Sequence, residues 1–279
     1  TPEDIEVTRP IRNGVISDYI MTERMLKIFV KSAIAKRKIW GKPNICVCVP
    51  SGVTDVQRRA ACDAVYRTGA KNVYVLEEPF AAAIGAGIDI DSSVGAMVVD
   101  IGAGTTDIAI VAKGGVQQSS SIKAGGDDFD EAIIRYMRKR HNVLLGDLSA
   151  EQLKKDIGSV YPREQDAVGY ARGKELVRGL PTKLAVKSSE MIEACQEITD
   201  QILEAVRAML EVAPPELVSD IAEHGIVLAG GGSKIFGMDK LITERIGVPV
   251  RNVKNPDQVV ATGAGTAHRY IKDSKEIEE

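Results

Sequence analysis

The stretch AMVVDIGAGTTDIAIVA, residues 96–112, places a glycine-rich turn between two apolar, β-branched runs. Glycines and threonines in such a turn let backbone N–H groups and hydroxyls approach an anion. The second run alternates as a strand does, so the turn is predicted to join a hairpin and to face a phosphate. A dinucleotide-binding loop would need a helix at this point, and a Walker loop would need a Gly-Lys-Ser/Thr sequence that is absent. On this turn alone, a tight hairpin without a ligand remains an open alternative.

Two further glycine turns follow predicted strands. AGGDDFDEAI, residues 124–133, closes one strand and opens a helix, and AGGGS, residues 229–233, lies between a buried strand and a helix expected near 234–246. Free N–H groups and the positive end of a helix at such turns suit a nucleotide. Asp127 and Asp128 could instead be simple N-terminal caps. The three turns together favour a nucleotide site more strongly than any one of them.

The surrounding pattern alternates buried strands with helices, which is typical of an α/β protein. Strands are expected at 45–49, 73–76 and 225–229, and helices at 55–68, 129–140, 150–157, 188–212 and 258–271. The helix at 188–212 carries an apolar stripe at steps of three and four residues, which indicates core packing. Residues 159–185 have mixed polarity and several glycines, so a loop with a short strand is expected there.

Composition excludes several classes of protein. The chain has 36 Lys and Arg against 39 Asp and Glu, a net charge of −3, and only 4% aromatic residues. Neither a basic field nor stacking aromatics therefore supports nucleic-acid binding. No apolar run approaches the ~20 residues of a membrane span.

Six segments together resemble the MreB family of bacterial actin homologues, which shares a superfamily with DnaK-type chaperones and sugar kinases. The resemblance covers nearly the whole chain and weakens between about 160 and 187. The segments are RPIRNGVISDY (9–19), EEPFAAAIGAG (77–87), VVDIGAGTTD (98–107), IKAGGDDFDEAI (122–133), APPELVSDIAEHGI (213–226) and GIVLAGGGSKIFGMDKLI (225–242).

The resemblance implies a role for each matching position. Asp100 would hold the Mg²⁺ of a bound ATP or ADP, and Glu78 would polarise the attacking water with help from Thr105. Without the resemblance, a structural alternative is that Glu78 is a carboxylate at a helix start, followed by Pro79 in the first turn. The implied nucleotide contacts are Gly102, Ala103, Gly104, Thr105 and Thr106 in the first turn, Gly125, Gly126 and Asp127 in the second, Glu151 and Lys154 at the ribose, and Gly230, Gly231, Gly232 and Ser233 along the adenosine.

Two departures from the family pattern stand out. Ala103 replaces the middle glycine of the usual GGGTT turn, which is expected to alter affinity rather than abolish binding. The family's first phosphate loop, a D-x-G-T hairpin, is absent, so a truncated or partial chain is inferred. Family members hydrolyse ATP slowly, and whether this chain does so is left open by the missing loop.

The implied fold is α/β, an actin-like (ribonuclease H-like) two-domain ATPase fold whose first domain is incomplete at its N-terminus. The first domain is expected at residues 1–94, completed by 265–279. The second is expected at 95–264, with a small subdomain at about 127–218.

The implied function is that of an ATP-binding cytoskeletal protein whose membrane-associated filaments organise cell-wall synthesis and set rod shape. The expected partners are further copies of the chain, the membrane surface, and membrane proteins of wall synthesis and shape determination, at the inner face of the cell membrane in the cytoplasm. Ile39 and Trp40, in the basic stretch KRKIWGK, are expected to touch the membrane, although Trp40 could instead pack against the core. A chaperone-like ATPase module and a sugar-kinase-type enzyme are the alternatives.

Overall fold

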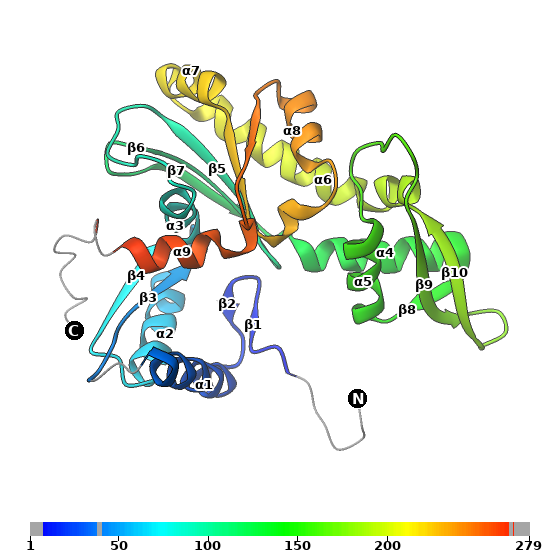
Figure 1. Ribbon diagram of the computed structural model, residues 1–279, viewed down its shortest axis with the longest axis horizontal. Helices are drawn as coiled ribbons and strands as arrows, with labels where there is room; N and C mark the ends of the chain where they lie inside the picture. Colours follow the sequence, from blue (N-terminus) through cyan, green and yellow to red (C-terminus); the bar gives the residue numbers. More distant parts are fainter. Residues whose placement is uncertain (1–7, 38–40, 268–269, 271–279) are drawn as a thin grey trace.

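The computed structural model describes residues 8–37, 41–267 and 270, and its centre is a five-stranded sheet in the order β12-β11-β5-β6-β7 (Figure 1). β5, β6 and β7 form an antiparallel meander, and β11 lies parallel to both β5 and β12. The strands are β5 (Ala96–Ile101), β6 (Thr106–Ala112), β7 (Gly115–Ile122), β11 (Ile226–Ala229) and β12 (Val250–Asn252). The predicted hairpin around the first glycine turn is therefore confirmed.

Helices cover both faces of this sheet, as the continuously apolar strands require. On one face, Val98 and Val111 form a core with α3 (Glu78–Gly85) and α9 (Val259–Thr266). On the other, Val99 and Ile108 form a larger core with α4 (Gly126–His141), α6 (Ser188–Val212) and α8 (Met238–Ile246). α7 (Pro215–His224), which the sequence did not predict, packs against β5.

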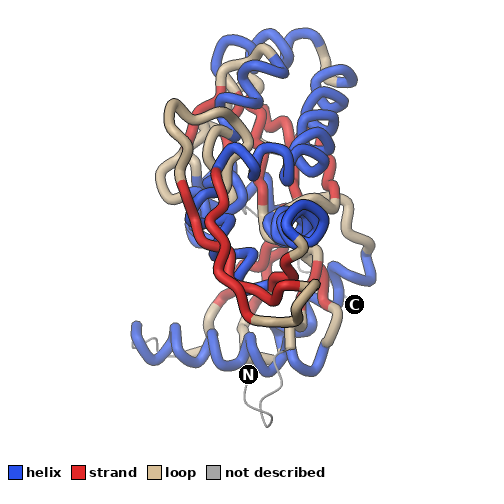
Figure 2. The backbone as a smooth tube through the Cα atoms, turned by 90° about the vertical axis from the view of Figure 1, so that its right-hand side faces the viewer, coloured by secondary structure: helices blue, strands red, loops and turns tan. Residues whose placement is uncertain are grey.

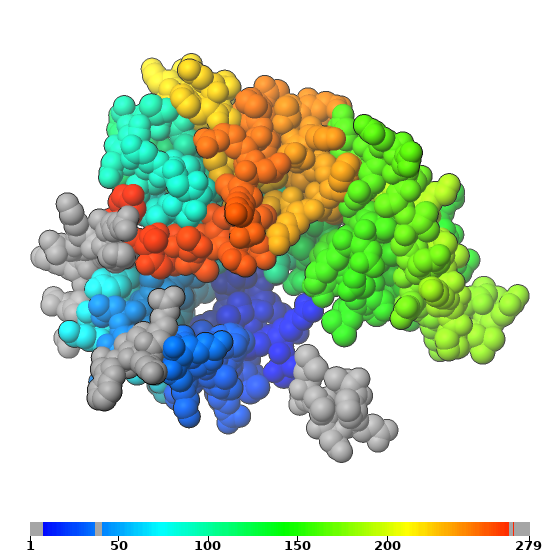
Figure 3. Space-filling view, in the orientation of Figure 1, coloured from blue at the N-terminus to red at the C-terminus, as the bar shows by residue number. Residues whose placement is uncertain are grey.

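A small lobe continues from β7 at the right of Figures 1 and 3. It consists of α4, β8 (Val143–Leu145), α5 (Asp147–Ile157), β9 (Val168–Glu175) and β10 (Pro181–Lys187), and α6 leads back to the main sheet. β8, β9 and β10 form an antiparallel sheet in the order β10-β9-β8. The expectation of a loop with one short strand at 159–185 is therefore wrong. Both strands are regular, and the inward positions of β9 carry Gly169, Ala171 and Gly173, which gave no apolar alternation to read.

The N-terminal part contains a short hairpin, two helices and a parallel strand pair. The elements are β1 (Ile11–Arg12), β2 (Val15–Ile16), α1 (Tyr19–Arg37), β3 (Asn44–Val49), α2 (Asp55–Tyr66) and β4 (Asn72–Glu77). α2 begins at a capping box of Thr54 and Gln57, which satisfies two backbone N–H groups at the helix start. No described helix is long and apolar enough to span a bilayer.

Two other expectations need adjustment. The helix expected to follow the AGGGS turn does not start at Lys234, because a 3₁₀ turn, η1 (Gly231–Lys234), comes first and α8 begins at Met238. Gly237 precedes α8 with a φ of 84°, a left-handed conformation that interrupts any helix. The final helix, expected at 258–271, is α9 over Val259–Thr266, and residues 268–269 and 271–279 lie outside the described part. The division into domains at residues 94 and 264 stays a prediction.

Candidate functional site

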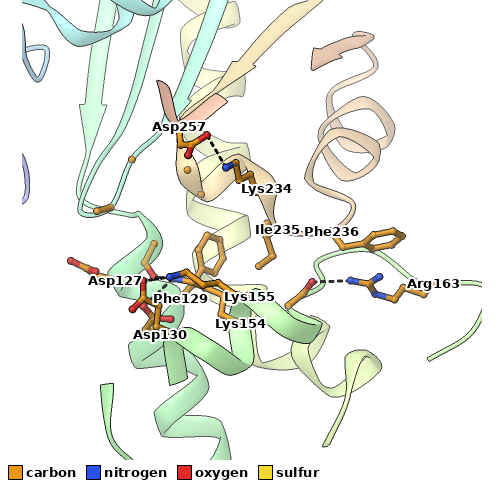
Figure 4. Close-up of a pocket in the computed structure, with 17 residues that line it drawn as sticks. Asp127, Phe129, Asp130, Lys154, Lys155, Arg163, Lys234, Ile235, Phe236 and Asp257 are labelled. Carbon is orange, nitrogen blue, oxygen red and sulfur yellow. Dashed lines mark hydrogen bonds and ion pairs between the residues drawn. The ribbon is translucent and has the colours of Figure 1, made fainter. Parts of the chain in front are cut away.

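A cavity of about 570 Å³ lies between α4, α5 and the turn that follows β11 (Figure 4). It brings together positions from all three glycine turns. The predicted residues that line it are Gly102, Ala103, Gly126, Asp127, Glu151, Lys154, Gly231 and Gly232. A volume of this size lies within the range of ordinary small-molecule pockets.

The first glycine turn is held rigidly at one end of the cavity. Gly102 N–H donates to the Thr105 carbonyl at 2.8 Å, which closes the turn, and Thr106 Oγ1 donates to the Ala124 carbonyl at 2.6 Å. The first N–H groups of α4 also bind this turn, because Gly126 N–H donates to Gly102 at 3.0 Å and Asp127 N–H donates to Ala103 at 2.7 Å. Thr105 and Thr106 are buried. These contacts place the turn and the start of α4 side by side.

At two of the predicted ligand-binding glycines, Gly104 and Gly125, nearby backbone atoms leave no room for a side chain. Close packing within the protein therefore explains these two glycines. A Cβ at Gly125 would lie 2.6 Å from the Ala103 carbonyl, and one at Gly104 would lie 2.8 Å from the Cα of Asn13. Neither glycine lines the cavity. Asp128 Oδ2 accepts from Gly125 N–H at 2.8 Å, so Asp128 caps the start of α4 from its third position, with Gly125 as the N-cap residue. The capping role left open for Asp128 is therefore confirmed.

The turn after β11 forms the opposite wall. Gly230 has a φ of 82°, and its Cβ position would lie 2.5 Å from Asp100 Oδ1, so only glycine fits there without strain. Gly231 and Gly232 line the cavity, whereas the Ser233 hydroxyl donates to the Gly230 carbonyl at 2.6 Å and lines a neighbouring cavity.

Charged side chains on α5 border the cavity between these walls. Lys154 Nζ donates to the Gly126 carbonyl at 2.6 Å and to Asp130 Oδ2 at 2.9 Å, which ties α5 to the start of α4. Burial raises the pKa of Asp130, and the hydrogen bond from Lys154 partly opposes this. Glu151 accepts from Lys155 at 2.7 Å, and this hydrogen bond lowers the pKa of Glu151.

The far end of the cavity is aromatic and was missed by sequence reasoning. The Arg163 guanidinium lies 3.8 Å from the centre of the Phe236 ring, and Ile235 lies beside them. Lys234 and Asp257 close another side through an ion pair of 2.7 Å (Figure 4). Phe236 lies three residues after the AGGGS turn at 229–233. Arg163 lies far from it in the sequence, in the segment of weakest resemblance, so no local spacing could have identified it.

The two carboxylates expected to serve the metal and the water lie outside the cavity, in a separate acidic group. Asp100 and Asp107 are cross-strand partners on β5 and β6, and Glu78, the first residue of α3, lies close enough for their charges to act on it. Burial, followed by the charges of Asp107 and Asp100, raises the pKa of Glu78 to about 8. Burial and Asp107 raise the pKa of Asp100 to about 7. Sequence reasoning missed Asp107, although its spacing from Asp100 about the turn predicts that the two side chains face each other.

This acidic group also joins the N-terminal part to the main sheet. Ser51 N–H donates to Asp107 Oδ1 at 2.8 Å, and Ser51 Oγ donates to Glu77 Oε2 at 2.7 Å. Within the described ranges, no three His, Cys, Asp or Glu side chains are placed to hold a metal ion by themselves. Ile39 and Trp40, the predicted membrane residues, lie outside the described residues.

Comparisons with known proteins agree on one family. The family described as MreB/Mbl protein matches residues 1–276. Cell shape-determining protein MreB of Escherichia coli K12 is 44% identical over 271 residues, 97% of this chain and 78% of that protein. Cell shape-determining protein Mbl of Bacillus subtilis is 41% identical over 265 residues, 95% of this chain and 79% of that protein.

Solved structures show the same likeness. MreB5 of Spiroplasma citri bound to ADP superimposes with a TM-score of 0.90 at 33% identity, over 97% of this chain and 81% of that one. The same protein bound to AMPPNP also gives a TM-score of 0.90, at 32% identity and the same coverage. The MamK double helical filament gives 0.80 at 25% identity, over 94% of this chain and 80% of that one.

Proposed function

We propose, because this chain belongs to the MreB/Mbl protein family, that it is a cell shape-determining protein that binds an adenine nucleotide and assembles into filaments. Its fold is the actin-like fold of that family, and the resemblance predicted from the glycine turns is confirmed. The chaperone-like and sugar-kinase-type alternatives are not favoured, since the matched proteins of Escherichia coli and Bacillus subtilis are named cell shape-determining proteins and MamK forms a double helical filament.

One observation carries the nucleotide proposal. Along a single cavity, the lining groups suit in turn the phosphates, the ribose and the base of a nucleotide. At one end, the N–H group of Ala103 lines the cavity beside the start of α4 and has no hydrogen-bond partner within the described residues, so it suits a phosphate. At the other end, the Arg163–Phe236 stack suits a flat base. Between them, the carboxylate of Glu151 and the ammonium of Lys154 suit ribose hydroxyls. The related MreB5 structures contain ADP and AMPPNP, which supports the same ligand class here.

The carboxylates present could hold Mg²⁺ only together with the phosphates of a bound nucleotide. Asp100 is a buried carboxylate whose pKa is raised by burial and by Asp107, so a nearby cation would stabilise its ionised form. Mg²⁺ commonly takes one or two carboxylates and completes its shell with substrate phosphates and water. We therefore assign Asp100 to the metal, which when bound would neutralise developing charge on the phosphates.

Glu78 is proposed to orient the attacking water, with help from the hydroxyl of Thr105 in the first glycine turn. Its position at the start of α3, next to the acidic pair of Asp100 and Asp107, keeps the carboxyl at the edge of the first glycine turn. The raised pKa of Glu78 indicates that cation binding nearby is needed to ionise it fully at neutral pH.

Nucleotide binding is tested by a substitution that fills the cavity and leaves the fold intact. Gly231 has an ordinary φ, and the atom nearest to an added Cβ is 3.9 Å away, so the backbone accepts a side chain here and Gly231→Val should put its methyl groups into the cavity that this residue lines. We expect calorimetry to show loss of ADP binding in this variant and unchanged binding in Gly115→Val, where an added Cβ meets nothing within 4 Å. Equal binding by both variants would place the nucleotide elsewhere.

Filament formation is tested separately. We expect ATP to drive the chain into a sedimenting polymer, and electron microscopy to show filaments. A chain that binds nucleotide and stays monomeric would favour an enzyme or chaperone-like module instead. The membrane location and the wall-synthesis partners are finer proposals, and Ile39→Ala with Trp40→Ala tests the first of them in a liposome sedimentation assay.

A further inference from the structure

Arg9 extends from the N-terminal part of the chain to the edge of the cavity between α4, α5 and the turn after β11. Its Nη1 atom lies 3.5 Å from Oδ1 of Asp127, which lines this cavity at the start of α4. The hydrogen bond from Lys155 lowers the pKa of Glu151, and the charge of Arg9 adds to this lowering, so Arg9 also lies near the α5 wall. Sequence reasoning gave no role to Arg9, which lies 118 positions before Asp127.

The backbone that carries Arg9 is fixed against the first glycine turn. β1 and β2 lie below the main sheet in Figure 1, and Figure 2, turned by 90°, shows α1 at the bottom with the small lobe above it. The Pro10 carbonyl, next to Arg9, accepts from Ser17 N–H at 2.9 Å, which closes the base of the β1–β2 hairpin. At the hairpin tip, the Cα of Asn13 lies 2.8 Å from the Cβ position of Gly104 in the first glycine turn. Backbone contacts, and not the ion pair alone, therefore hold Arg9 beside the cavity.

The cavity lining carries as many carboxylates as cations, and each of its lysines is already paired with an acid. The pairs are Lys154 with Asp130 at 2.9 Å, Lys155 with Glu151 at 2.7 Å and Lys234 with Asp257 at 2.7 Å. The remaining cation, Arg163, lies on the Phe236 ring at the base end. The remaining acid, Asp127, lies at the phosphate end, where its charge would repel a diphosphate. Within the described part of the chain, Arg9 is the cation that balances Asp127.

The ion pair between Arg9 and Asp127 is open to water. The two side chains are 56% and 53% exposed, and exposed ion pairs add little to stability because water and salt screen them. Phosphates offer Arg9 more negative charge and several oxygens, and the planar guanidinium binds such groups through paired hydrogen bonds. A phosphate that enters beside Ala103 therefore competes successfully with Asp127 for Arg9.

We propose that Arg9 binds the phosphates of the nucleotide and exchanges its ion pair with Asp127 for them. This inference rests on the proposed function, since it uses the phosphate end assigned there. Arg9 belongs to the N-terminal part and the glycine turns to the main sheet, so the bound phosphates are held by both parts of the chain. In a permanent tie between the two parts, by contrast, Arg9 and Asp127 would stay paired and both would be needed equally.

Equilibrium dialysis of the full chain with ADP and with adenosine, in the presence of Mg²⁺, tests this. Arg9→Gln removes the cation and Asp127→Asn removes its partner; Arg12→Gln is the matched control, because Arg12 is an exposed arginine of the same hairpin that does not line the cavity. Arg9→Gln should weaken ADP binding about tenfold, the scale of one hydrogen bond to a charged group, and Arg9→Lys should restore part of the loss. Asp127→Asn should strengthen ADP binding about twofold to fivefold, since it frees Arg9 and removes a repelling charge. Adenosine binding should be the same in every variant, and Arg12→Gln should match the wild-type chain with both ligands.

Urea unfolding gives a second readout and checks that the variants fold. Because the ion pair is exposed, nucleotide-free Arg9→Gln and Asp127→Asn should follow the wild-type unfolding curve. A fixed concentration of ADP should then stabilise the wild-type chain more than Arg9→Gln, because tighter binding to the folded state gives more stabilisation. Equal stabilisation of the two chains by ADP would overturn the proposal.

The opposite signs of the two substitutions decide between a phosphate contact and a permanent tie. Weaker ADP binding in both Arg9→Gln and Asp127→Asn would indicate a tie and overturn the proposal, and so would unchanged ADP binding in Arg9→Gln. An equal loss of ADP and adenosine binding in Arg9→Gln would show an effect on the shape of the cavity and would also overturn it. A wild-type chain that binds neither ligand would refute the proposed function and this inference with it, whereas failure of the inference alone leaves ADP binding by the wild-type chain intact.

Discussion

Replacing Glu78 by Gln should make the nucleotide-free chain more stable at alkaline pH and leave it unchanged in acid. In the unfolded chain this carboxyl titrates near 4.5, whereas burial and the neighbouring acids raise its pKa to about 8 in the folded chain. Between these two pH values the folded state holds the proton more tightly. The unfolding free energy contributed by Glu78 is therefore fully present below about pH 4.5 and is lost as the pH rises toward 8.

The size of the effect follows from the same two values. A change of pKa from 4.5 to about 8 corresponds to about 5 kcal/mol at 1.36 kcal/mol per pH unit. This is an upper limit, because Asp100 and Asp107 share the repulsion and can take up protons in place of Glu78. A gain of about 2 to 5 kcal/mol for Glu78→Gln is thus expected above about pH 8.5, and a difference near zero at about pH 4.5.

Urea unfolding with a chelator present, at several pH values, measures this directly. The exposed acid Glu211, changed to Gln, serves as the control for loss of one negative charge. Parallel stability curves for the wild-type chain and Glu78→Gln across this pH range would show that Glu78 is not desolvated beside the acidic pair. The reasoning about its role near the first glycine turn would then fail with it.

Three further outcomes are expected. In a chain with full ATPase activity, Glu78→Ala should lower turnover far more than ATP affinity, measured by steady-state hydrolysis beside equilibrium binding; an equal loss in both would make the residue structural. Gly230→Ala should lower the free energy of unfolding in urea by about 2 kcal/mol or more. Gly247→Ala, at a glycine with a similar φ but open space around it, should lower it by about 1 kcal/mol, and equal losses would contradict the close packing at Gly230. Lys154→Met should lower the free energy of unfolding by about 3 kcal/mol, because it leaves Asp130 buried without its partner. Adding Asp130→Asn should restore part of this loss in the same assay, and no restoration would refute the pairing.

The sequence was sufficient where local pattern and tertiary packing agree. β-branched residues on both sides of the first glycine turn predicted the β5–β6 hairpin, and the stripe over 188–212 predicted α6 to the residue. The three glycine turns predicted two opposite walls of the cavity, because the strand ends that they follow converge at one edge of the sheet.

The rest depended on packing that no local pattern reveals. In β9, the inward Gly169 lies against Leu153 and Ile157 of α5, so close packing replaces the apolar side chains by which a strand is usually recognised. The start of α8 was misplaced because Gly237 adopts a left-handed conformation, and the residues before it, Ile235 and Phe236, face the cavity instead. The position of Arg163 on Phe236 is a contact between distant segments, which spacing cannot predict.

The order of strands in the main sheet has a consequence for synthesis of the chain. β5 has β6 on one side from the outset, but its other edge is covered only by β11, which begins at Ile226. Parallel pairing between such distant segments forms slowly, and an uncovered apolar edge is prone to pair with other chains. While the ribosome is still extending the chain, β5 therefore stands open, and a chaperone that shields it would govern how much of the newly made protein reaches its native state.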